Sequence, residues 1–152
     1  NASETISDKH RYYQIDDVLI EELNELDTFD KNGVLAQEVI FPLNQIQFKT
    51  GSALLNDKKS LEQLNNAVSF LKLNPSIRIR VHGHTDSIGN KESNINLSKM
   101  RAQFVAHYLS KSGINKNRIL WEGHGDHYPI QNNNTVKDRS NNRRVEIEII
   151  EN

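Results

Sequence analysis

Residues 81–102, VHGHTDSIGNKESNINLSKMRA, contain the transition that decides the fold of this chain. The stretch begins inside SIRIRVHGH, residues 76–84, where apolar and polar side chains alternate as they do along a half-buried β-strand. A small polar loop follows, and a helix is predicted from near Lys91 to Ser112, with Gly113 as its stop signal. A strand that passes through a polar loop into a long helix indicates an α/β protein.

Similar signals on both sides of this stretch complete the predicted order of elements. We expect a strand over 39–48, regular from Leu43 after Pro42, a helix over 57–73 with Asn56 as its N-cap, and strands over 118–123 and 143–150. The long polar segment 124–142 is predicted as a loop. The predicted fold is therefore α/β: a two-layer βαβαββ sandwich with the helices packed on one face of a mixed four-stranded sheet. The second helix is expected to bury Leu97, Met100, Phe104 and Tyr108, with Val105 and Leu109 beside them.

Length and charge divide the chain into a leader and one domain. Its 152 residues suffice for one core. Residues 1–40 are expected to be an acidic leader or linker, partly helical in DDVLIEELNEL, and residues 41–152 the domain. Residues 1–38 hold ten acids and three bases, net −7, so ten acids and sixteen bases, net +6, remain in 39–152. No run of Lys and Arg is long enough to indicate nucleic-acid binding.

Targeting and redox signals are sparse. The chain has no cysteine, which excludes disulfides and thiolate metal sites. No apolar run approaches the roughly 20 residues that span a bilayer. The first residues, NASETISDKH, lack a start methionine and a signal-type apolar core, so we expect a processed piece of a longer protein. Membrane attachment is expected only through a missing N-terminal anchor or domain.

The loop and helix of the opening stretch offer opposite charges to one small ligand. Asn94 and Arg101 are seven residues apart and share a helix face, and helical side chains lean toward the N-terminus, so Arg101 points back toward the loop with Asp86. A guanidinium suits a carboxylate and Asp86 suits an ammonium group, which together describe a zwitterion. The alternative is that Asp86 caps a turn and forms a structural ion pair with Arg101.

Five segments carry a resemblance to a known family: IQFKTGSALL, VHGHTDSIGN, NINLSKMRAQFVAHYLSKSGI, RILWEGHGDHYPI and NNRRVEIEII. In this order, over roughly residues 41–150, the chain resembles the OmpA-like C-terminal, peptidoglycan-associated domain family. The resemblance implies a fold of the βαβαβ type and noncovalent binding of the diaminopimelate in the peptidoglycan stem peptide. It implies that Asp86 receives the ammonium of diaminopimelate and that Arg101 holds its carboxylate.

The resemblance implies further site residues. These are Asn94 and Leu97 on the second helix, Phe48 with the loop residues Thr50, Gly51 and Ser52, and Arg143. Strand alternation independently places Arg143 on the side of Val145 and Ile147, whereas Arg144 shares a side with Glu146 and Glu148. The family often has an aspartate where this chain has Lys49, so the role of Lys49 stays open.

The expected function is to anchor a larger envelope protein to the cell wall at the periplasmic side of the outer membrane, without catalysis and without a cofactor. Other envelope proteins are possible additional partners. One alternative is a zinc-assisted cell-wall hydrolase that uses histidines at 82, 84, 124 and 127 with Asp126. The other alternative is a protein-interaction module that does not bind the wall.

Overall fold

The computed structural model of this chain describes residues 10–12, 38–43, 46, 48 and 57–151. The strands in this part are β1 (His10–Tyr12), β2 (Glu38–Pro42), β3 (Arg78–Gly83), β4 (Ile119–Gly123) and β5 (Val145–Glu151). The helices are α2 (Lys58–Leu73), α3 (Lys91–Lys111) and α4 (Val136–Asn142), with a 3₁₀ turn at Lys116–Arg118. None of these helices is both long and apolar enough to cross a membrane.

The strands form one mixed sheet in the order β1-β2-β5-β3-β4. β3 and β4 are parallel, and β5 runs antiparallel to both β3 and β2. The predicted α/β fold with a mixed sheet of four strands and packed helices is confirmed by β2, β3, β4 and β5. The segment predicted as leader adds β1, which pairs in parallel with β2, and the predicted boundary at residue 40 falls within β2.

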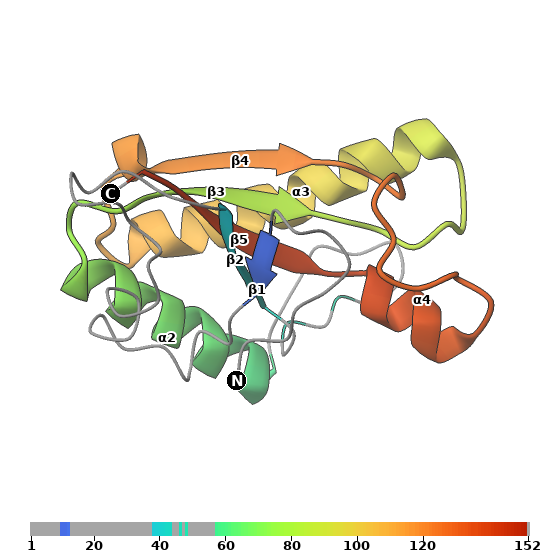
Figure 1. The fold of residues 1–152 in the computed structure, drawn as a ribbon, viewed down its shortest axis with the longest axis horizontal. Helices are drawn as coiled ribbons and strands as arrows, with labels where there is room; N and C mark the ends of the chain where they lie inside the picture. The colour runs from blue at the N-terminus through green and yellow to red at the C-terminus, as the bar shows by residue number, and fades with distance from the viewer. Residues whose placement is uncertain (1–9, 13–37, 44–45, 47, 49–56, 152) are drawn as a thin grey trace.

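α2 and α3 cover the apolar side of the sheet, which exists because the strands alternate as predicted. Ile79 and Val81 of β3 are fully buried, and they share the core with residues of α2 and α3. α3 runs along β3 and β4 (Figure 1). The ring of Phe70 on α2 lies 5.3 Å from that of Phe41 on β2. The other side of the sheet carries the polar residues of β3.

Glycines let α3 approach the ends of β3 and β4 closely. A Cβ atom on Gly83 would lie 2.1 Å from the carbonyl oxygen of Ser98, and one on Gly123 would lie 2.3 Å from the backbone nitrogen of Lys99. Any larger residue would push the helix away from the sheet at this point. The loops after β3 and β4 and the helix α4 then lie together at one end of the sheet (Figure 1).

Some local predictions were wrong. The strand predicted over 39–48, regular from Leu43, is β2, which instead lies before that point and ends at Pro42. Pairing with β5 runs through Pro42, and one more hydrogen bond follows it, from the Leu43 N–H to the Val145 carbonyl at 2.9 Å. The N-cap of α2 is Asp57, not Asn56, since the Asp57 carboxylate accepts the Ser60 N–H at 2.8 Å. The predicted loop 124–142 contains α4, capped by Thr135. The helix expected in residues 16–26 lies outside the described residues.

The buried side of α3 also differs from the prediction. Met100 is 55% exposed, Phe104 and Tyr108 are partly buried against the core, and Leu97 is half-buried. The buried residues of α3 are instead Asn94, Ser98, Arg101, Ala102, Val105, Ala106 and Leu109. Val105 and Leu109 were predicted correctly, but the buried side at the start of the helix is polar.

Candidate ligand-binding site

Asp86 lies in the loop between β3 and α3 and is almost fully buried. Its Oδ1 accepts the backbone N–H of Ile88 at 2.9 Å, which closes a tight turn. Its Oδ2 accepts from Nη1 of Arg143 at 2.7 Å, so the two side chains form an ion pair. Asp86 thus caps a turn, as one alternative predicted, and its ion pair is with Arg143.

Arg101 lies on α3 and has no exposed surface. Its Nη1 donates to the backbone carbonyl of His84 at 3.2 Å, and its guanidinium carbon lies 4.9 Å from the centre of the Phe48 ring, a cation–π contact. Burial, and to a smaller extent the charge of Arg143, lower the pKa of Arg101 to about 10, whereas the charge of Asp86 opposes this shift. The guanidinium therefore remains charged at neutral pH.

Asn94 connects the first turn of α3 to the same loop. Its Nδ2 donates to the carbonyl of Ile88 at 3.1 Å and, at the longer distance of 3.5 Å, to that of Asp86. The cap of the helix is Asn90, whose side chain accepts the N–H groups of Glu92 and Ser93. The loop therefore holds its shape through side chains of α3.

Five of the predicted residues come together around this loop: Asp86, Asn94, Arg101, Arg143 and Phe48. Leu97 lies half-buried on α3, one turn from Arg101. Thr50, Gly51 and Ser52 lie outside the described residues, as does Lys49. Among these five residues the charged groups are one carboxylate and two guanidinium groups, an arrangement suited to a small ligand that carries both charges.

Sequence reasoning missed how the loop 124–142 is held against this site. Asn142 is fully buried at the end of α4, where its Oδ1 accepts the N–H groups of Ile130 and Gln131 at 2.8 and 3.0 Å. Arg143 follows directly as the C-cap of α4 and so is fixed where it meets Asp86. No local pattern in the sequence indicates this role, because an isolated asparagine in an Asn-rich loop is typical of a turn.

Three histidines of the hydrolase alternative gather beside Glu146 and Glu148 of β5: the ring of His124 stacks on those of His82 and His84. His84 is buried and its Nε2 lies 2.9 Å from the Glu146 carboxylate, which also meets Arg144 at 3.1 Å. Burial lowers the pKa of His84 to about 4 and is the leading cause of that shift. Arg144 and Glu146 lie on one side, as strand alternation predicted.

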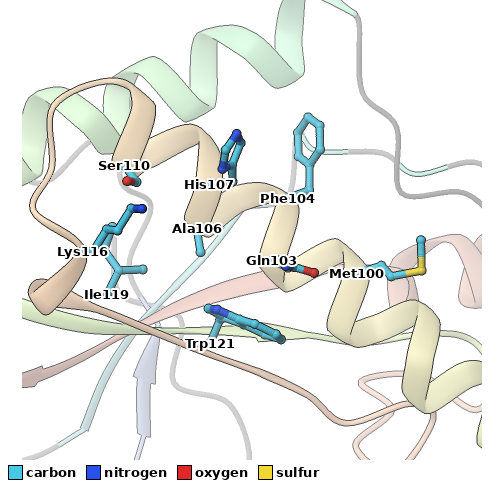
Figure 2. A pocket seen from close by; sticks show the side chains of 9 residues that line it. All are labelled: Met100, Gln103, Phe104, Ala106, His107, Ser110, Lys116, Ile119 and Trp121. Atoms are coloured by element: carbon cyan, nitrogen blue, oxygen red, sulfur yellow. The ribbon is translucent and has the colours of Figure 1, made fainter.

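A separate apolar hollow of about 560 Å³ lies between α3 and β4. Figure 2 shows the side chains around it, among them Met100, Phe104 and His107 of α3 and Trp121 of β4. None of the predicted site residues lines this hollow. The charged site and the apolar hollow are therefore different features of α3.

Residues 47–143 match the OmpA family. The chain belongs to the OmpA family. Outer membrane protein A of Bordetella avium is 36% identical over 122 residues, which cover 80% of this chain and 61% of that protein. The peptidoglycan-binding protein ArfA of Mycobacterium tuberculosis is 41% identical over 97 residues, which cover 60% of this chain and 30% of that protein. This OmpA-family chain thus spans less than two thirds of either relative.

Solved structures agree with the fold of this OmpA-family chain. The peptidoglycan-associated lipoprotein from Burkholderia pseudomallei has a TM-score of 0.63 at 23% identity, and the match covers 70% of this chain and 88% of that one. At this identity the likeness supports the architecture alone.

Proposed function

We propose that this OmpA-family chain binds peptidoglycan noncovalently and thereby attaches a larger envelope protein to the cell wall. The observation that carries this proposal is the convergence of Asp86, Arg101 and Arg143 at the loop after β3, within the part of the chain that matches the family. A relative 41% identical over 97 residues is named as a peptidoglycan-binding protein, which supports the same function. Relatives named as outer-membrane proteins support a location at the periplasmic side of the outer membrane.

The ligand that we propose is the zwitterionic centre of diaminopimelate in the stem peptide. Asp86 would receive its ammonium group, and Arg101, with Arg143 nearby, would receive its carboxylate. Charge-assisted hydrogen bonds of this kind are about twice as strong as neutral ones. Phe48, Asn94 and Leu97 would form the walls of the site, together with Thr50, Gly51 and Ser52 as the family resemblance implies.

Burial adds a requirement to this proposal. Asp86 is 4% exposed and Arg101 is 0% exposed, so a ligand that contacts both must displace groups that cover them. The Asp86–Arg143 ion pair, which spans 2.7 Å, is the contact that an incoming ammonium group would compete with. Binding would then exchange one ion pair for two, and a rearrangement of this kind slows association relative to a preformed site.

We propose a binding role without catalysis. The printed names of the relatives describe outer-membrane and peptidoglycan-binding proteins, which favours binding over hydrolysis. Of the histidines in the hydrolase alternative, His84 is buried beside Glu146 and His127 is hydrogen-bonded through Nδ1 to the His124 carbonyl, which does not favour a catalytic centre.

A pull-down on purified sacculi tests the function. The chain is expected to sediment with sacculi and to be released by free diaminopimelate, while bovine serum albumin stays in the supernatant. Absence of sedimentation would contradict wall binding. Sedimentation that diaminopimelate does not reverse would contradict the proposed ligand and leave another wall component as the partner. Release of soluble wall fragments during the incubation would contradict a role without catalysis.

A further inference from the structure

Two histidines and a glutamate converge on the polar side of the sheet, away from Asp86. The donor atoms of His82, Glu122 and His124 all lie within 4.8 Å of one another. β3 and β4 are parallel, and His82 is the register partner of Glu122, so the two side chains lie next to each other. His124 directly follows β4, and its ring stacks on that of His82 with the centroids 4.9 Å apart.

The hydrogen bonds of His82 determine which nitrogen is available as a ligand. Its Nε2 lies 2.9 Å from Oε1 of Glu148, a carboxylate that accepts a hydrogen bond from the Nε2–H group. A neutral His82 therefore has its lone pair on Nδ1, which lies only 2.6 Å from Nε2 of His124. At this distance the two nitrogens share a proton in a hydrogen bond, and a tetrahedral cation could replace that proton if the rings moved apart by about 0.7 Å. A histidine that donates its far N–H to a carboxylate is also the usual arrangement around a bound metal ion.

Charge and exposure at the cluster favour a cation. Oε2 of Glu122 lies 3.8 Å from Nε2 of His124, while its Oε1 meets Nε of Arg80 at 3.3 Å. Arg80 also approaches Glu148 at 3.6 Å, so one guanidinium is shared between two carboxylates and the net charge of these three groups is −1. The side chains of His82, His124 and Glu122 are 16%, 20% and 49% exposed, which leaves the cluster open to ions from solvent.

We propose that His82 Nδ1, His124 Nε2 and the Glu122 carboxylate form a binding site for a divalent transition-metal ion of the zinc type. Two imidazoles and one carboxylate are donors that Zn²⁺ accepts, and a water molecule would complete four-coordination. Glu148 would act as the positioning residue that fixes the ring of His82. The ion would join β3 to the edge strand β4, and its binding does not depend on the proposed wall binding.

Calorimetric titration with ZnCl₂ tests the site, using the tag-free chain after treatment with chelator and dialysis. We expect about one Zn²⁺ per chain, and at least about tenfold weaker binding in His124→Gln, which removes a ligand. Glu148→Gln should weaken binding by about 10- to 100-fold. His107→Gln is the matched control, because His107 is an exposed histidine on α3. No zinc uptake by the wild-type chain, or equal loss in His107→Gln and His124→Gln, would overturn the proposal.

A measurement on the wild-type chain avoids the question of whether the variants fold. Histidine side-chain ¹⁵N resonances are recorded before and after one equivalent of Zn²⁺. We expect the shifts at His82 Nδ1 and His124 Nε2 to change, with His107 unaffected. If zinc shifts other histidines and leaves these two nitrogens unchanged, the proposed ligands are wrong.

Discussion

Replacing Asp86 by asparagine is the sharpest test of the charged site, because the change preserves shape and removes one charge. The remaining Oδ1 can still accept the Ile88 N–H, now 2.9 Å away, so the turn after β3 is kept. What is lost is the negative charge 2.7 Å from Arg143, which is also the charge proposed to receive the ligand ammonium. Asp86→Ala would remove the turn as well and would mix two effects.

The expected loss of binding follows from the hydrogen bonds that Asp86 makes as a charged group. A hydrogen bond to a charged group contributes about 1.5–3 kcal/mol. Since about 1.4 kcal/mol corresponds to a factor of ten, binding of the ligand should weaken about ten- to hundredfold. Stability should fall by about 1–3 kcal/mol, because Arg143 loses its counter-charge and faces the new amide NH₂ group, which cannot accept its hydrogen bond. Typical domains are stable by about 5–15 kcal/mol, so the variant should remain folded.

Sacculus pull-down, calorimetry with diaminopimelate and urea unfolding are measured on the same preparations. Asp57→Asn is the matched control, because it makes the same change of net charge at the exposed N-cap of α2, where asparagine caps equally well. The reasoning is refuted if Asp86→Asn binds sacculi and diaminopimelate as tightly as the wild type. It is also refuted if the control loses binding to the same degree.

Three further predictions concern packing, the loop and the ligand. Gly83→Ala should lower the free energy of unfolding by at least about 1–3 kcal/mol, because the added Cβ would lie 2.1 Å from the Ser98 carbonyl oxygen. Urea titration measures this loss, and an unchanged unfolding midpoint would contradict the close approach of α3. Asn142→Ala should lower the free energy of unfolding by about 1–3 kcal/mol, because the N–H groups of Ile130 and Gln131 lose their acceptor. Proteolysis within 124–142 should become faster, and a cleavage rate equal to that of the wild type would contradict this role. In calorimetric titrations, diaminopimelate should bind more tightly than lysine or the amidated analogue, and added salt should weaken its binding only modestly. Equal affinities for the three compounds, with a strong loss of binding in salt, would favour general attraction by the basic domain.

The sequence predicted the elements whose signal is local. The helix at 57–73 and the strand at 78–83 have clear periodicity, and both lie within a residue or two of their predicted bounds. β1 is three residues long and exists through its pairing with β2, a contact that sequence spacing does not encode. α4, VKDRSNN, is polar and short, so it has no apolar stripe to detect.

The partner of Asp86 could not be predicted for a similar reason. Arg101 follows Asp86 by 15 positions and lies on the helix that begins after the same loop, so helix geometry indicated Arg101 as the partner of Asp86. Arg143 lies 57 positions away, and its approach depends on β5 lying beside β3 and on α4 ending directly before it. Strand alternation correctly placed Arg144 and Glu146 on one side, but the ion pair between Arg143 and Asp86 is a product of the tertiary fold.

The error in the buried side of α3 points to the same site. The apolar residues predicted a stripe through Met100, yet α3 is rotated so that Asn94, Ser98 and Arg101 are buried and Met100 lies beside the hollow of Figure 2. Burying a guanidinium is unfavourable unless it is paired or hydrogen-bonded, so apolar periodicity alone would never place Arg101 inside. The contacts that compensate are the His84 carbonyl, the Phe48 ring and the charge of Asp86, all of which lie at the end of the sheet where the ligand is proposed to bind. Apolar periodicity mispredicts the buried side of α3 because a charged residue is buried there. Functional sites are where such departures from local sequence rules are expected.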